Sequence, residues 1–574
     1  MARLLRTVRH LRPGQAWALV RHRLRPEVRP AAPPAVAPEL ALGAPAAAFP
    51  PPPPHAWFDG VGRLRLVGHE VLFTSGLDFD HTERGPLFAF HLHQFDYLRR
   101  DGIPPGRRAA ILDRWIAEHR AGIGWSPHPL GLRILAWLKL LLTPGALALR
   151  PESHRRIRRS LAAQAETLDR HLEFHLGANH LLSNLLAVVA AGVALEGPEA
   201  GRWLRRVGRL RRELREQVPE DGAHYERSPM YHALLLESVL DLLNLAGASP
   251  RTPPPLEEEL RDAAARMLGA LAVYTHPDGE IALFADSALG MALPPGRLAE
   301  YATALGVAPR GPDRPGVLPD AGYVRLEAGG LSLLASVGGP APAHQPGHAH
   351  CDALSFELCL GRERVVVDTG VYEYLPGPLR DLSRSTRAHA TVEVGGLEQS
   401  EVWGAHRVGG RARVSLLGVD PGRWLEAECR GWATPEHPHR RRIEVRPGAV
   451  EIRDSVGGGA VPVCTRLPLA PGARVELAGT RAGIELAGGA RLRVELPEEI
   501  AWRVERAPCF PAFGRLEERP VLVGEGVAPV RMHTRFEPVT GAPARVAPPA
   551  GARGVASPAR RGRGGRAAPP RRRG

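Results

Sequence analysis

The stretch YVRLEAGGLSLLASV, residues Tyr323 to Val337, decides the fold class of this 574-residue chain. Apolar residues recur at every second position on both sides of a Gly-Gly pair. Such alternation is typical of two antiparallel strands joined by a tight turn. Short runs of the same kind, separated by glycine-rich turns, continue to about residue 537. The sequence therefore predicts an antiparallel β-sandwich in this half of the chain.

Upstream of this stretch, from about residue 85 to 310, apolar residues recur at three- and four-residue spacing. This spacing predicts helices with a buried face, separated by Pro and Gly. Many successive helical hairpins in one domain favour an (α/α) toroid. We therefore predict an α+β multidomain chain, with an N-terminal (α/α) toroid over residues 56–316 and a C-terminal antiparallel β-sandwich over residues 317–540.

The two ends of the chain carry its positive charge. Residues 1–30 contain eight Arg and one Glu, and residues 541–574 contain nine Arg and no acidic residue. The net charge of +14 therefore leaves a near-neutral body, which argues against a nucleic-acid partner. Residues 1–55 are expected to form a basic segment and a Pro/Ala linker, which docks on its own domain or touches a membrane surface. Residues 541–574, rich in Arg, Pro and Gly, are expected to be disordered.

Cysteine spacing and hydropathy restrict the class further. The five cysteines are scattered and show no CxxC spacing, which argues against a disulfide framework or a zinc ribbon. We expect no transmembrane segment, because the apolar runs are too short or too interrupted to span a bilayer. No signal peptide is evident in the sequence, so the expected location is cytoplasmic or envelope-associated.

A cluster of histidines precedes one predicted strand, in HQPGHAHCDALSFEL, residues 344–358. If this segment is extended, His348, His350 and Asp352 share one face of the sheet. Cys351 would then point to the opposite face, as a small core residue. The alternative is a hydrogen-bonded surface group of histidines without further function.

Neighbouring strands supply more metal-binding residue types. Asp368 ends the apolar run RVVVDTG, and His389 begins another run in RSTRAHATVEV. Together with His350 they would give two imidazoles and a carboxylate, which is a reasonable zinc ligand set.

Two helix starts in the toroid carry polar residues. Asn179 and His180 open an apolar helix in LGANHLLSNLL, although Asn179 could simply be the N-cap. In DGAHYERSPMYHALLLESVL, Ser228 and the proline after it predict the N-cap and first helical position. Tyr231 and His232 would then lie in the first turn and could face a cleft at the barrel mouth, or could simply pack in the core.

These motifs together resemble the heparinase II/III family of polysaccharide lyases, and they occur in the family's order from about residue 85 to 420. The resemblance implies a toroid joined to a β-sandwich. It also implies β-elimination on a uronic-acid polysaccharide. The motifs are GWSPHPLGLRILAWLKLL, GANHLLSN, DGAHYERSPMYHALLLESVLDL, HPDGEIALFADSA, GHAHCDALSFEL, VVVDTGVYEY and RSTRAHATVEVGGLEQSEVWGAHRV.

The resemblance also implies catalytic roles. Removing the C5 proton beside a carboxylate requires that the charge of this carboxylate be neutralised, and the matching residues are Asn179 and His180. Tyr231 and His348 match the acid/base pair of the family. The further residues that could bind substrate are Glu226, Arg227, His232, Arg384, Arg387 and Trp403.

A metal ion is implied as well. His350, Asp368 and His389 match the family's metal-binding positions. The expected cofactor is Zn²⁺ with a mainly structural role, because it would fix the loop that presents His348.

Three functions of different classes stay open. The first is a lyase acting on an acidic polysaccharide, which requires Asn179, Tyr231 and His348 to converge on one cleft. The second is a non-catalytic acidic-glycan-binding protein of a surface-polysaccharide assembly system. The third is a glycoside hydrolase with Glu226 as its acid, which requires a second carboxylate across the cleft.

Overall fold

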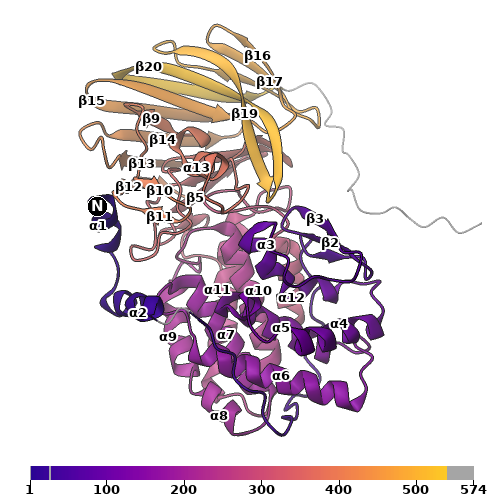
Figure 1. Ribbon diagram of the computed structural model, residues 1–574. Coiled ribbons are helices and arrows are strands. Elements are labelled where there is room, and N and C mark those ends of the chain that lie inside the picture. Colours follow the sequence, from indigo (N-terminus) through magenta and orange to yellow (C-terminus); the bar gives the residue numbers. More distant parts are fainter. Residues whose placement is uncertain (1, 25–26, 540–574) are drawn as a thin grey trace, which may run out of the picture.

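The computed structural model describes residues 2–24 and 27–539 of the chain. A helical domain is followed by two packed β-sheets (Figure 1). This arrangement confirms the predicted order of an (α/α) toroid and an antiparallel β-sandwich. The tail predicted to be disordered, residues 541–574, lies outside the described residues.

The helical domain is built around helices that are apolar on almost every side. In α7 and α10 nearly every residue is buried, whereas α9 buries one face only. Most helices begin at a proline, whose fixed φ and missing N–H suit the first helical position. The helices are α3 (Gly85–Leu92), α4 (Pro105–Glu118), α5 (Pro127–Leu142), α6 (Pro151–Arg170), α7 (Ala178–Ala194), α8 (Pro198–Leu204), α9 (Val207–Gln217), α10 (Pro229–Gly247), α11 (Pro254–Tyr274) and α12 (Pro295–Ala304).

A small antiparallel sheet, β1 (Trp57–Phe58), β2 (Arg63–Leu66) and β3 (His69–Leu72), precedes α3. The first sheet of the sandwich has five strands in chain order and contains the stretch that decided the fold class. Tyr323 pairs with Ser336 and Ala328 with Leu331, so this stretch is a hairpin as predicted. The five strands are β4 (Val317–Leu318), β5 (Tyr323–Ala328), β6 (Leu331–Ser336), β7 (Phe356–Leu360) and β8 (Glu363–Val366).

The second sheet has ten strands in the order β12-β13-β14-β15-β20-β18-β17-β16, with β19 paired to β20 and β9 to β15. Its ladders are antiparallel throughout. The strands are β9 (Val392–Val394), β12 (Arg413–Asp420), β13 (Trp424–Arg430), β14 (His439–Arg446), β15 (Ala449–Pro468), β16 (Arg474–Ala478), β17 (Arg481–Glu485), β18 (Arg491–Glu495), β19 (Ala501–Ala512) and β20 (Arg515–Pro538). The short strands β10 (Val402–Trp403) and β11 (Arg407–Val408) and the helix α13 (Pro378–Arg384) lie outside both sheets.

The two sheets share one apolar core. Leu333 and Phe356 of the first sheet belong to the same buried cluster as Ile443, Ile452 and Val494 of the second. Burial alternates along β14, where every second residue is buried, because successive side chains of a strand point to opposite faces.

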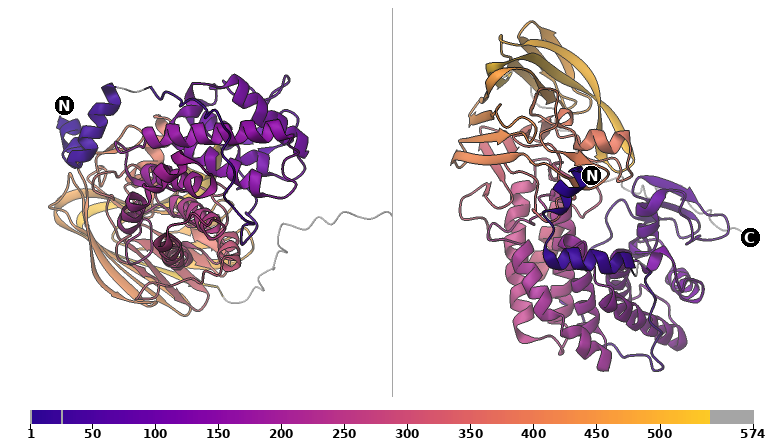
Figure 2. Two further views of the ribbon diagram at one scale, coloured as in Figure 1. Left: turned by 90° about the horizontal axis from the view of Figure 1, so that it is seen from below. Right: turned by 60° about the vertical axis from the view of Figure 1, so that its left-hand side comes forward.

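The N-terminal helices α1 (Ala2–Val8) and α2 (Pro13–Leu24) lie across both domains (Figures 1 and 2). Thr7 of α1 accepts a hydrogen bond from Trp403 Nε1 at 3.1 Å. Gln15 of α2 donates to the carbonyl of Leu176 at 3.4 Å. The segment thus docks on its own protein. None of the helices in residues 2–24 and 27–539 is both long and apolar enough to cross a bilayer.

The structure excludes two local possibilities that the sequence left open. The histidine-rich segment before β7 is a loop rather than a strand, because its backbone bonds to other segments: Asp286 N donates to His348 O at 3.2 Å, and Cys351 N donates to Arg384 O at 3.0 Å. Cys351 is nevertheless buried, as expected. Asn179 is not an N-cap, because α7 begins at Ala178 and its N-cap is Gly177. Asn179 therefore lies in the first turn, where its side chain is free to bond elsewhere.

Candidate active site

Helix starts from the toroid meet the histidine loop of the sandwich. The predicted start of α10 is confirmed, because Ser228 is the N-cap and its Oγ accepts a hydrogen bond from Tyr231 N at 3.3 Å. This cap fixes the first turn that carries Tyr231. A pocket opens beside the two helix starts, and both Asn179 and Tyr231 line it.

Three of the four residues predicted to be catalytic come together here. Asn179 Nδ2 donates to Glu226 Oε2 at 2.6 Å and lies 3.2 Å from His348 Nε2. The Tyr231 ring stacks on the His348 ring, with centroids 3.9 Å apart. The hydroxyls of Tyr231 and Tyr374 are hydrogen-bonded at 3.1 Å. Side chains from distant parts of the sequence thus form one polar cluster, from which Asn179 and Tyr231 reach the pocket.

A buried carboxylate orients His348. Asp286 Oδ2 is 2.8 Å from His348 Nδ1, and Asp286 Oδ1 is 2.9 Å from His350 Nε2. Arg380 donates to both oxygens of Asp286, with Nη2 2.9 Å from Oδ2. Burial opposes the charge of Asp286, but Arg380 and the two histidines hold its pKa well below the usual range.

The charge of Asp286 decides which nitrogen of His348 carries the proton. A carboxylate only accepts hydrogen bonds, so Nδ1 of His348 donates to it. In the neutral ring, the Nε2 lone pair then accepts the hydrogen bond from Asn179 Nδ2. This lone pair points toward Asn179, so the ring is arranged as a base on the side of the cluster.

Burial sets the protonation of the neighbouring groups. It raises the pKa of Tyr231, so this side chain is a neutral phenol that can donate its proton. Burial also raises the pKa of Glu226, although His348 and Asn179 partly oppose the shift. The cluster therefore combines a neutral acid with a carboxyl group that is poorly disposed to ionise.

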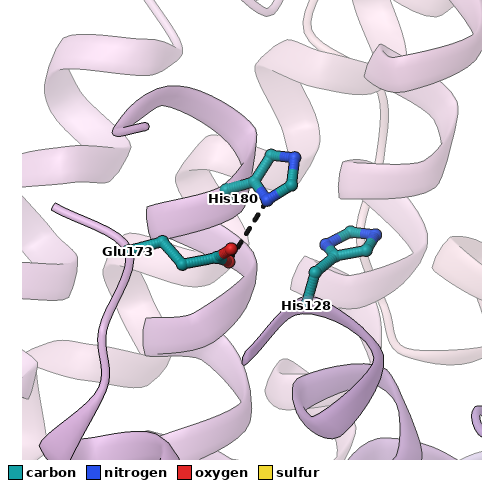
Figure 3. A group of neighbouring side chains, drawn as sticks. All are labelled: His128, Glu173 and His180. Atoms are coloured by element: carbon teal, nitrogen blue, oxygen red, sulfur yellow. Dashed lines mark hydrogen bonds and ion pairs between the residues drawn. The ribbon is translucent and has the colours of Figure 1, made fainter. Parts of the chain in front are cut away.

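His180 bonds to another carboxylate. Its Nδ1 lies 3.2 Å from Glu173 Oε2, and its ring centroid is 4.6 Å from that of His128 (Figure 3). Burial opposes the charge on His180, but the Glu173 carboxylate raises its pKa above the ordinary value. Burial lowers the pKa of His128 to about 3, so that ring is neutral.

The predicted metal ligands lie near one another. His389 Nδ1 is 2.8 Å from Asp368 Oδ2, and the rings of His350 and His389 are 5.5 Å apart. His350 Nδ1 and His389 Nε2 are buried and have no hydrogen-bond partner among the described residues. Two such nitrogens fit a metal ion, although Asp368 stands in this structure as the partner of the His389 ring.

All six of the predicted substrate-binding residues lie outside the pocket lining. Arg384 is buried and donates to the carbonyls of Ala349 and Gly404. Arg227 donates to the carbonyls of Gly339 and Asp320. These guanidinium groups hold loops of the sandwich, and their donors are taken by backbone oxygens.

Other protein groups also engage two of the remaining predicted binders, His232 and Trp403. His232 accepts from His224 N at 3.1 Å and its Nε2 donates to Met267 O at 2.9 Å, so both ring nitrogens are engaged. Trp403 contacts α1, and Arg387 is exposed. Of the six predicted binders, Glu226 joins the catalytic cluster. Four of the other five are engaged by other protein groups, and a binding role for Arg387 stays a prediction.

Sequence reasoning missed the groups that orient the acid and the base. Asp286 and Tyr374 both occur in motifs that carry the family resemblance, HPDGEIALFADSA and VVVDTGVYEY. The presence of Asp286 and Tyr374 in these motifs could have pointed to a role for both residues. Arg380, in α13, has no comparable signal, because an arginine in a polar turn looks like a solvated residue.

Two family models match the chain. The model "Heparinase II/III N-terminus" matches residues 148–304 and "Heparinase II/III-like, C-terminal" matches residues 310–541. The chain belongs to the heparinase II/III-like family. Membership places it, at the level of the family, among the polysaccharide lyases, as the motifs predicted.

Similar proteins show how the family fold varies. The chain is 26% identical over 475 residues to FtsZ-localized protein C of Caulobacter vibrioides, covering 77% of this chain and 78% of that protein. The crystal structure of heparinase III has a TM-score of 0.64 at 17% identity, covering 83% of this chain and 81% of the other. Heparan sulfate lyase HepC from Pedobacter heparinus has a TM-score of 0.55 at 17% identity, covering 84% and 82%. These structures share the toroid and sandwich of the heparinase II/III-like family.

Proposed function

We propose that this member of the heparinase II/III-like family cleaves an acidic, uronic-acid-containing polysaccharide by β-elimination. The convergence of three side chains supports the proposal. Asn179 lies 3.2 Å from His348 Nε2, and Tyr231 stacks on the same imidazole. A base, an acid and an amide donor would therefore reach a single sugar ring.

In the proposed reaction, His348 Nε2 takes the proton from C5 of the uronic acid. The bond between C4 and O4 breaks as a double bond forms between C4 and C5. Tyr231 gives its phenolic proton to the departing O4, since burial keeps it protonated. Asp286 stabilises the imidazolium that forms on His348, and Arg380 keeps Asp286 ionised.

Neutralisation of the substrate carboxylate falls to Asn179 and His180. Amide donors placed where negative charge develops stabilise an enolate-like transition state. In the free protein Asn179 donates to Glu226, so substrate binding would exchange this partner for the carboxylate of the sugar. His180 lies beside Asn179 at the same helix start, and because its Nδ1 faces Glu173, its Nε2–H would be the group that donates to the sugar carboxylate.

We also propose a zinc ion bound by His350, Asp368 and His389, with a mainly structural role. The unpartnered nitrogens His350 Nδ1 and His389 Nε2 support it. His350 also bonds to Asp286, so a metal on this ring would stiffen the loop that carries His348. Metal analysis of wild type against His389→Ala tests this site, and equal metal content in both would contradict it.

Ultraviolet absorbance tests the elimination directly. The full chain is incubated with alginate, heparosan, heparan sulfate, hyaluronan, chondroitin and glucuronate-containing exopolysaccharides, because the conjugated double bond left by elimination absorbs and a hydrolysis product does not. Tyr231→Phe and His348→Ala are expected to lower the rate by about 10²–10⁴-fold. Arg423→Ala, which changes an exposed side chain between β12 and β13, serves as the control. A rate unchanged in both cluster variants would sink the proposal.

The second candidate is a non-catalytic acidic-glycan-binding protein of a surface-polysaccharide assembly system. One observation favours it: a relative over most of the chain is named for its localisation with FtsZ rather than for a lyase activity. Glycan binding without a rise in absorbance, unchanged in Tyr231→Phe, would support this function. The hydrolase alternative is weaker, because Glu226 does not line the pocket. The carboxylates that do, Asp96, Glu237 and Asp241, are paired with Arg99 or Lys139.

We further propose that the docked helices α1 and α2 touch an anionic membrane surface, which would make the protein envelope-associated. Trp17 is 70% exposed and Leu24 is 77% exposed, next to basic residues. Exposed aromatic and aliphatic side chains beside arginines suit a lipid interface. Sedimentation with phosphatidylglycerol vesicles should fall in Trp17→Ser. Equal sedimentation of both forms would argue against this contact.

A further inference from the structure

A second group of polar side chains lies in the helical domain beside Asn179, and the proposed elimination uses only one of its members. It consists of His128 in the first turn of α5, Glu173 between α6 and α7, and His180 in the first turn of α7. One possible ligand atom from each lies within 4.8 Å of the other two. Both rings flank the carboxylate (Figure 3). Three separate segments thus bring these groups to one point.

We propose that His128, Glu173 and His180 bind a divalent transition-metal ion, with Zn²⁺ the best match to the donor set. Two imidazoles and one carboxylate, with one position left open, form the ligand set of several catalytic zinc sites. Ligands bound about 2.0–2.2 Å from zinc in a tetrahedron lie about 3.3 Å from one another. Glu173 Oε2 and His180 Nδ1 are 3.2 Å apart, so only the His128 ring has to move closer.

The hydrogen bonding of the His128 ring gives independent support to the metal site. Its Nδ1 is buried and has no hydrogen-bond partner within residues 2–24 and 27–539. Buried polar atoms in folded proteins almost always have a partner. A neutral imidazole offers its lone pair to a metal ion, so a bound cation would satisfy this nitrogen.

The charge around Glu173 also favours a cation. Within the described part of the chain, Glu173 pairs with His180 and with no arginine or lysine. Asn184 fixes the orientation of Glu173, because its Nδ2 donates to Oε2 at 3.2 Å and its Oδ1 accepts from Glu173 N at 3.0 Å. Such outer hydrogen bonds are typical of metal-ligating carboxylates.

A second group of possible metal ligands among the described residues differs in what balances the charge of its carboxylate. Asp286, His348 and His406 also have ligand atoms within 4.8 Å of one another. Arg380, however, donates to both oxygens of Asp286. The guanidinium already supplies the positive charge, so this group does not need a metal ion.

Metal binding is measured directly, and the test therefore does not depend on the elimination. The full chain is stripped of metal with a chelator, dialysed and titrated with Co²⁺ and then Zn²⁺, following bound equivalents and the visible absorbance of the bound cobalt. Glu173→Gln and His128→Ala are each expected to lose one equivalent, with affinity reduced on the order of 100-fold or more. Asn184→Ala should weaken the same site by about 10–100-fold.

Two variants make the result specific. His175→Ala is the matched control, because His175 lies on the same connection but stacks on His22 with centroids 3.9 Å apart; it should keep every equivalent. His389→Ala should lose a different equivalent, if the zinc site of the sandwich is filled. Thermal unfolding in chelator shows which variants fold, and His128→Gln replaces His128→Ala if that variant does not fold.

No metal bound by the wild-type chain would overturn the proposal. So would binding that Glu173→Gln and a folded His128 variant leave unchanged. A chain that binds metal here but forms no unsaturated products would support the metal site and contradict the proposed elimination. Elimination by a chain that binds no metal at this site would support the proposed function and contradict the metal site.

Discussion

Two buried carboxylates of this molecule each hold histidines, and they differ in what balances their charge. Asp286 contacts His348 and His350 and is clamped by Arg380. Glu173 contacts His180 and an amide, without a guanidinium among the described residues. A buried carboxylate with its own arginine can orient a histidine permanently. One balanced only by histidines keeps room for an external cation.

The largest loss in the free energy of unfolding is expected at Asp286. Asp286→Asn should lower the free energy of unfolding by about 3–5 kcal/mol, because it leaves the buried Arg380 guanidinium unpaired. Both side chains are fully buried. Denaturant unfolding near pH 7 measures the loss. The double variant Asp286→Asn/Arg380→Met, which removes both charges, should recover part of it. A loss below about 1 kcal/mol for the single variant would mean that the clamp is not a tight ion pair.

The same carboxylate-to-amide change at Glu173 should have a smaller effect. Glu173→Gln is expected to lower the free energy of unfolding by roughly 1–2 kcal/mol in chelator, because a charge-assisted hydrogen bond to His180 weakens while the amide oxygen can still accept. No buried guanidinium is left unpaired. The measurement is denaturant unfolding beside the Asp286 variant. An effect as large as that at Asp286 would remove the distinction between the two sites.

The sequence predicted the catalytic cluster better than the groups around it. Helical spacing and the Ser-Pro start placed Tyr231 in the first turn of its helix, because capping is a local property. His348 was placed near the cleft by resemblance alone, since strand alternation gave the wrong backbone for a loop held by tertiary hydrogen bonds. Arg384 and Arg227 were predicted to bind substrate, and they instead bind backbone carbonyls. Which acceptor a guanidinium meets depends on the packing of distant segments, which no local pattern contains.

The pH dependence of stability sharpens the comparison further. The pKa of His180 is raised in the folded protein, so its contribution is fully present below about pH 6.5 and is lost as the pH rises through the folded value. Burial opposes the charge of Glu173, but His180 lowers its pKa, so the contribution of Glu173 is lost as the pH falls below about 4.5.

Wild type and Glu173→Gln should therefore differ most between about pH 4.5 and 6.5 and differ less at pH 8.5. Unfolding in chelator at pH 5.5 and 8.5 tests this, with His180→Asn as a second variant that should remove the same dependence. A difference that grows toward pH 8.5 would show that Glu173 is not balanced by a protonated His180.

The smallest effect is expected where burial is absent. Arg114 and Glu118 form an i,i+4 pair on α4 at 2.9 Å, with both side chains more than 40% exposed. Glu118→Gln should lower the free energy of unfolding by about 0.3–0.5 kcal/mol, because water screens the pair and both side chains lose entropy on pairing. Unfolding at low and high salt measures it, and the loss should shrink in high salt. A salt-independent loss above 1 kcal/mol would show that an arginine partner alone, without burial, makes a carboxylate important. The contrast between Asp286 and Glu173 would then rest on the arginine partner alone, and burial would not be needed to explain it.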